Sequence, residues 1–234
     1  MMRKAMAEQA GKEGNTQVTV EENDEPFSPT GFTGSYTMEI HSYKKGVEEK
    51  GSPMRMRMAI TDEKIAMIPE PTPDGEVRMI HDLKERCTYT LMTDKKGERT
   101  GMKMKMHKVK VESKEPEDDG KVVRTEETKV IDGHTCRKYT FSDAEGSGWS
   151  WIAEDVAMDM RKVFGQMASG RKVERWQDMP YGGMLMETEW TSSDGNERTV
   201  MHTKDLVVGK SDPADFSTEG HAIQDLTAFP MPGR

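Results

Sequence analysis

The chain has 234 residues, of which 33% are hydrophobic and 32% charged, and its formal net charge is −8. This acidic balance argues against a general nucleic-acid partner, because neutralising phosphates requires an excess of clustered Lys and Arg. No run of about 18 apolar residues is present, so the sequence predicts no transmembrane segment. Methionine is unusually frequent, with 21 residues, and supplies apolar volume that Leu, Ile and Phe usually provide.

Residues 1–30 are polar and charged, which predicts a flexible leader. No apolar signal-peptide core follows Met1, and no cysteine near the start is placed to carry a lipid. We therefore expect that, if the natural protein is exported, its signal peptide has been removed from this sequence.

Alternation of apolar and polar residues begins at Phe32 and predicts a half-buried strand as far as His41. Further strands are predicted, separated by turn residues, over 54–60, 65–68, 77–83, 86–93, 102–106, 121–131, 135–142, 147–152, 183–191 and 198–208. The residues at 192–196, SSDGN, join the last two as a hairpin. The fold class is therefore mainly β, with residues 31–218 forming a curved antiparallel sheet, a half-barrel of about nine to eleven strands. Residues 219–234 are expected to form an irregular C-terminal tail.

One main helix is predicted over 155–169, where apolar residues recur at helical spacing and Gly170 supplies a stop. Its residues Met160, Phe164 and Met167 are expected to serve as a lid over the sheet.

The methionines fall in alternating positions on several strands. Residues 54–58 read MRMRM and residues 102–106 read MKMKM, so each segment places three methionines on one face. Methionine is unbranched and adapts to varied apolar shapes. We predict a ligand-binding face formed by Met38, Met54, Met56, Met58, Met102, Met104, Met106, Met184, Met186 and Trp190. The alternative is that the same residues form an ordinary filled core.

A third interpretation is binding of Cu(I) or Ag(I), because thioether sulfurs are soft ligands. The interleaved Arg and Lys oppose a cation, and the six histidines are scattered, so we expect no metal site and no cofactor. The sequence contains no GxGxxG, P-loop, HExxH or GxSxG motif, and no catalytic residues are predicted. Cys87 and Cys136 form no CxxC pair, and both a disulfide and two buried free thiols fit the sequence.

Residues 128–140 (TKVIDGHTCRKYT), followed by 151–155 (WIAED), resemble a bacterial family of secreted or lipid-anchored proteins of unknown function. The opening 32–36 (FTGSY) and the closing Asp215-Phe216 also resemble that family, so the likeness runs from about residue 30 to 218. The family is similar to the LolA and LppX half-barrels, periplasmic carriers whose concave apolar face holds acyl chains beneath a helical lid. The resemblance implies a location outside the cytoplasm, periplasmic or extracellular, and an apolar ligand, and it assigns no catalytic residue.

These patterns and the resemblance together predict a non-catalytic cell-envelope protein that binds or carries an apolar small molecule, a lipid or acyl chain, on the methionine-rich concave face. A structural or interaction module with a filled core and an envelope protein partner is the alternative, followed by the Cu(I)/Ag(I)-binding protein.

Overall fold

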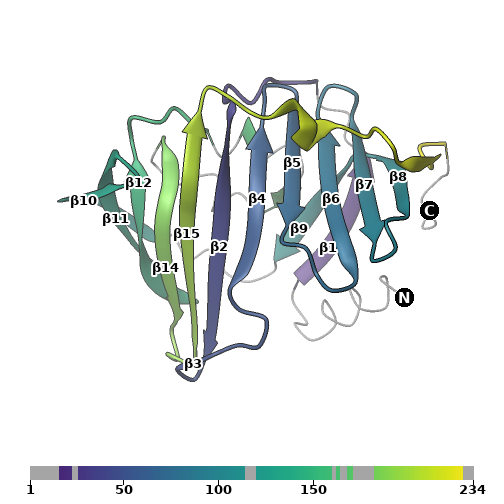
Figure 1. Ribbon diagram of the computed structural model, residues 1–234. Coiled ribbons are helices and arrows are strands. Elements are labelled where there is room, and N and C mark those ends of the chain that lie inside the picture. The colour runs from purple at the N-terminus through teal and green to yellow at the C-terminus, as the bar shows by residue number, and fades with distance from the viewer. Residues whose placement is uncertain are drawn as a thin grey trace.

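A computed structural model describes residues 16–22, 26–113, 120–159, 162–163, 168–170 and 182–228 of the chain, with side chains described over 26–107, 120–159, 162–163 and 182–228. Thirteen strands form one open, curved sheet (Figure 1). Its order is β10-β11-β12-β14-β15-β2-β4-β5-β6-β7-β8-β16, with β3 paired to β2. Neighbouring strands run antiparallel except β16, which pairs parallel with β8.

The strands of this main sheet have the following bounds: β2 Gly34–Lys44, β3 Val47–Glu48, β4 Met54–Ile60, β5 Lys64–Pro69, β6 Gly75–Asp82, β7 Cys87–Asp94, β8 Arg99–Lys105, β10 Lys121–Ile131, β11 His134–Ser142, β12 Gly146–Ala153, β14 Met184–Ser192, β15 Glu197–Val208 and β16 Ala222–Asp225. The predicted hairpin between β14 and β15 is confirmed. Its turn is fixed by Asp194, whose carboxylate accepts hydrogen bonds from the Ser192 hydroxyl and the Asn196 amide.

A second sheet contains β1 (Thr16–Glu22), β9 (His107–Ser113) and β13 (Ala168–Gly170) in the order β1-β9-β13. In Figure 1, β1 and β9 lie behind the β5–β8 part of the main sheet. The chain passes from one sheet to the other at Met106, between the end of β8 and the start of β9. β1 lies within the segment predicted as a leader, and β16 lies within the predicted tail.

The structure corrects the predicted strand number and the predicted lid helix. The main sheet has thirteen strands rather than nine to eleven. Within the described part of 155–169, only residues 162–163 are helical. Val156 and Met158 are buried and Ala157 between them is exposed, a period of two that belongs to extended chain. The β-branched side chain of Val156 also lowers the helix propensity at this place.

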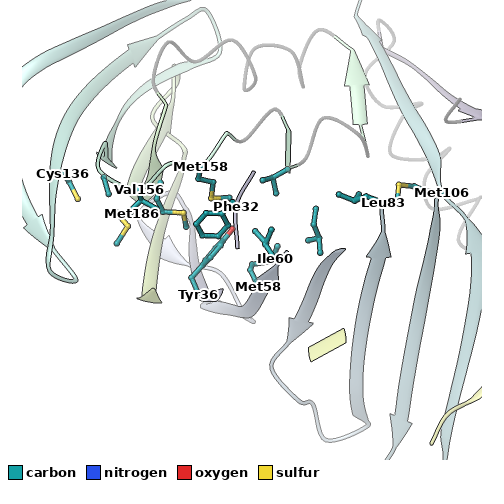
Figure 2. Packing of buried hydrophobic residues seen from close by; sticks show 14 residues of the cluster. Phe32, Tyr36, Met58, Ile60, Leu83, Met106, Cys136, Val156, Met158 and Met186 are labelled. Atoms are coloured by element: carbon teal, nitrogen blue, oxygen red, sulfur yellow. The ribbon is translucent and has the colours of Figure 1, made fainter. Parts of the chain in front are cut away.

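Apolar clusters lie on both faces of the main sheet. We define the inner face as the one on which Tyr36 of β2 and Met58 of β4 lie. Both belong to the larger cluster, which also includes Phe32, Met158 and Met186 (Figure 2). The outer face carries a smaller cluster of Ala59, Ala66, Ile80 and Leu91. Met58 and Ala59 are neighbours in β4, so their side chains point to opposite faces.

The chain after β15 packs across the outer face. It includes the 3-10 helix η1 (Pro213–Phe216), and in Figure 1 it crosses in front of the upper ends of β5 to β8. The Asp215 carboxylate lies 3.0 Å from the Arg57 guanidinium, and Phe216 packs against the outer-face cluster. This strap covers apolar surface that would otherwise be exposed to water.

Candidate functional site

The strand register brings methionines from several strands onto the inner face. Met58 is paired with Met67, and Met67 is paired with Met79. Thr90 of β7 is paired with Met79 on one side and with Met102 on the other. Paired residues on adjacent strands direct their side chains to the same face. This methionine row (Met58, Met67, Met79 and Met102) therefore crosses five strands, from β4 to β8.

A second set of paired residues lies beside the methionine row. Met38 is paired with Met56, and Ile40 with Met54. By alternation along β8, Met104 shares the face of Met102. The strand register therefore places Met54, Met56 and Met58 on the same sheet face as Met102 and Met104.

Burial divides the inner face into a filled part and an open part. Met58, Met184 and Met186 are at most 2% exposed, and they share one cluster with Phe32, Val156, Met158 and Val163. Met56, Met67, Met79 and Met102 are half-buried, whereas Met54 is 51% exposed and Met104 is 37% exposed. The filled part is ordinary core, and the open part presents apolar surface.

Two of the predicted residues, Met106 and Trp190, have other surroundings. Met106 is buried next to Leu83 in the core, beyond the end of β8. Trp190 is half-buried, and its indole ring lies over Gly146 in β12, apart from the main cluster. The expected lid residues Met160, Phe164 and Met167 lie outside the described residues.

Met67, Met79 and Met92 also point to the inner face, and the sequence prediction did not include them. Each occupies a strand position in phase with the predicted methionines, but each is the single methionine of its face within its strand. A search for MxM pairs misses such residues, and only the register between strands reveals them.

A charged network occupies the outer face around Glu39, whose side chain is 7% exposed. Its carboxylate accepts a hydrogen bond from Arg55 Nε at 2.6 Å and from Lys204 Nζ at 2.6 Å. These bonds favour the charged form and hold the pKa of Glu39 at about 2. Hydrogen bonds to Glu48 and Glu39 raise the pKa of His41 above its ordinary value.

Both cysteines are free and buried, so the structure shows the second of the two alternatives that the sequence left open. Burial raises the pKa of the Cys136 thiol to about 11 and also raises that of Cys87. At neutral pH both groups are therefore protonated, a form that neither attacks electrophiles nor binds metals well.

The described part of the chain contains no group of three or more His, Cys, Asp and Glu residues placed to hold a metal ion. Among the same residues, no helix combines the length and the apolar character that crossing a bilayer requires.

No protein-family model matches the chain, and no curated protein matches it. A solved structure of PNGF-II in space group C2 is similar to it with a TM-score of 0.37 and 12% identity over 82% of this chain and 31% of that chain. The chain thus spans about a third of the length of PNGF-II. A putative outer membrane lipoprotein-sorting protein domain from Vibrio parahaemolyticus gives a TM-score of 0.22 and 10% identity over 82% of this chain and 91% of that chain. A DUF1329 family protein from Desulfovibrio piger gives a TM-score of 0.24 and 9% identity over 80% of this chain and 91% of that chain. All these TM-scores lie below 0.5, so nothing about activity follows from them.

Proposed function

We propose that this protein binds an apolar ligand, a lipid acyl chain, on the open part of the inner face and that it performs no catalysis. The observation that supports this proposal most is the methionine row, which continues from the filled core at Met58 to half-buried side chains at Met67, Met79 and Met102. A protein that uses its methionines only as core has no need to leave three of them partly open in one row.

The chemistry of such a site rests on shape and apolar contact. Thioether side chains have three rotatable bonds and repack around ligands of different outline. Each methylene removed from water contributes about 0.8 kcal/mol, so one acyl chain binds usefully without a charged anchor. The hydroxyl of Thr88 lies 3.0 Å from the His81 ring, next to the open methionines, and this polar pair would orient the head group.

The same proposal places the protein in the cell envelope, the location implied by the resemblance of residues 128–140 and 151–155. Fractionation of bacteria that produce the full-length protein tests this part separately. Recovery from the cytoplasm alone would exclude the envelope location and leave the binding proposal to its own experiment.

The binding experiment is native mass spectrometry of the purified protein, before and after incubation with palmitic acid. We expect either a co-purified apolar molecule or a palmitate adduct, and loss of both in the double variant Met79→Asp/Met102→Asp. The matched control is Val130→Asp, which places the same carboxylate at a 68% exposed valine in β10.

A wild-type protein that carries no apolar molecule and takes up no palmitate would overturn the proposal. Equal uptake by the double variant would show that the ligand lies elsewhere. A stoichiometric mass increase with Cu(I) and none with palmitate would favour the metal-binding alternative.

A further inference from the structure

A shallow groove lies on the outer face of β10, β11, β12 and β14, with a volume of about 510 Å³. These strands form one end of the main sheet, far from β8 in the strand order (Figure 1). Two rows of paired residues line the groove. One row contains Thr140, Trp149 and Glu189, and the other contains Ser142, Ser147 and Thr191. Lys121 of β10 is paired with Ser142 and lies at the end of the second row.

The groove is separate from the methionine row. Trp149 and Glu189 lie on the face of Val200 and His41, and His41 shares that face with Glu39 and Arg55. Arg55 alternates with Met54 and Met56 in β4, so it points to the outer face. A ligand in this groove therefore does not touch the proposed acyl-chain site.

The polar side chains of the groove are available to a ligand. Within the described part of the chain, the hydroxyls of Thr140, Ser142, Ser147 and Thr191 and the Lys121 ammonium form no hydrogen bond or ion pair with protein. The indole N–H of Trp149 likewise donates no hydrogen bond to protein within the described residues. Glu189 is held by Arg198 at 2.6 Å, and this pair leaves the second carboxylate oxygen of Glu189 free to accept a hydrogen bond. The Trp149 ring thus lies among hydroxyl groups that have no protein partner within the described residues.

We propose that this groove is a binding site for a neutral oligosaccharide. A pyranose ring has an apolar C–H face and a rim of hydroxyls, and it matches a half-buried Trp flanked by Ser and Thr hydroxyls. The groove spans four strands at a spacing of about 4.8 Å, which gives room for more than one sugar ring. Its volume also falls within the range of about 300–1,000 Å³ that is usual for small-ligand sites.

Other ligand classes fit the groove less well. An acyl chain would leave the four hydroxyls without partners, which costs free energy for each group that it shields from water. Lys121 and Glu189 bring opposite charges to the groove, so it has no strong preference for an anion or a cation. A nucleobase would also stack on Trp149, but a net charge of −8 opposes the phosphates that accompany it.

The experiment is isothermal titration of the full chain with cellotetraose, maltotetraose and chitotetraose, and with AMP as the nucleobase probe. We expect at least one tetrasaccharide to bind and AMP not to bind. Trp149→Ala should weaken that binding at least tenfold, and Trp149→Phe should retain part of it, because a smaller aromatic ring still stacks. Ser147→Lys, at an exposed strand position, fills the groove and should also abolish binding without relying on the tryptophan.

The matched control is Trp151→Phe, two residues along β12, where the indole lies under the amino groups of Lys129 and Lys138 rather than in the groove. It should bind like the wild type. The proposal is overturned if no tetrasaccharide binds at millimolar concentration, if only AMP binds, or if saccharide binding persists unchanged in both Trp149→Ala and Ser147→Lys. Because the test uses no apolar ligand, its result is independent of the acyl-chain proposal.

Discussion

The ammonium group of Lys204 lies 2.6 Å from the carboxylate of Glu39, although the two residues are 165 positions apart in the chain. Arg55 contacts the other carboxylate oxygen at 2.6 Å, so Glu39 of β2 joins the two strands that flank it, β15 and β4. Both cations favour the ionised carboxyl, which keeps its pKa at about 2. The network thus ties the centre of the main sheet together through one poorly exposed charge.

Replacement of Glu39 by Gln should lower the free energy of unfolding by about 1–2 kcal/mol at pH 7. This is the low end of the scale for hydrogen bonds to charged groups, because Arg55 and Lys204 are partly exposed and solvent screens them. The pKa of Glu39 is lowered on folding, so its contribution is complete above its unfolded pKa of about 4.3. It is lost as the pH falls from there toward about 2. Urea denaturation at several pH values measures the difference between wild type and variant.

The control for this measurement is Glu76→Gln, because Glu76 is exposed and belongs to the β6 part of the sheet. It should leave stability at pH 7 within about 0.5 kcal/mol of the wild type. A Glu39→Gln variant that remains equally destabilised at pH 2 would show that the network acts through packing rather than charge.

His41 and His81 should titrate in opposite directions. Hydrogen bonds to Glu48 and Glu39 raise the pKa of His41, whereas burial lowers that of His81. Since the pKa of His41 is raised on folding, its stabilising contribution is present below about pH 6.5 and is lost as the pH rises through its folded pKa. NMR titration of the two rings measures both values, and His41→Gln assigns the signal. A His41 midpoint below that of His81 would contradict the observed hydrogen bonds.

The C-terminal strap should contribute measurable stability through Phe216. This ring is half-buried against Ala59, Ala66, Ile80 and Leu91 on the outer face. Phe216→Ala should lower the unfolding free energy by about 2 kcal/mol, less than the 3–5 kcal/mol typical of fully buried rings. Exposed Val208→Ala, eight residues earlier, should change it little. Equal unfolding curves for Phe216→Ala and wild type would mean that the strap is not held on the sheet in solution.

The strands of the main sheet were largely predictable because alternation of apolar and polar residues reports a sheet face directly. The bounds of β4 and β10 agree with the predicted segments 54–60 and 121–131. The same alternation predicted that Met56 and Met102 share a face, since a regular register preserves parity from strand to strand.

The sequence predictions were wrong or incomplete where the local sequence pattern and the tertiary contacts differ. Val156, Met160 and Val163 have helical spacing in the sequence, but the burial of Val156 and Met158 follows an extended chain. After Met106 the chain passes from β8 to β9 of the second sheet, although the sequence analysis assigned all the strands to one sheet. The Glu39 network and the Trp149 groove depend on partners from strands that are distant in the sequence, so no local sequence pattern predicts them.

Truncation of two methionines of the predicted face should lower the unfolding free energy by different amounts, because one lies in the filled core and the other on the open surface. Met186 is 0% exposed within the main cluster, so Met186→Ala leaves a cavity and should cost about 2–5 kcal/mol of unfolding free energy. Met104 is 37% exposed in β8, and Met104→Ala should cost less than about 1 kcal/mol. Denaturation in urea measures both, and an unchanged slope with denaturant concentration confirms that folding remains two-state. Equal costs for the two variants would mean that Met104 is packed as tightly as the core, and the open part of the inner face would then not exist.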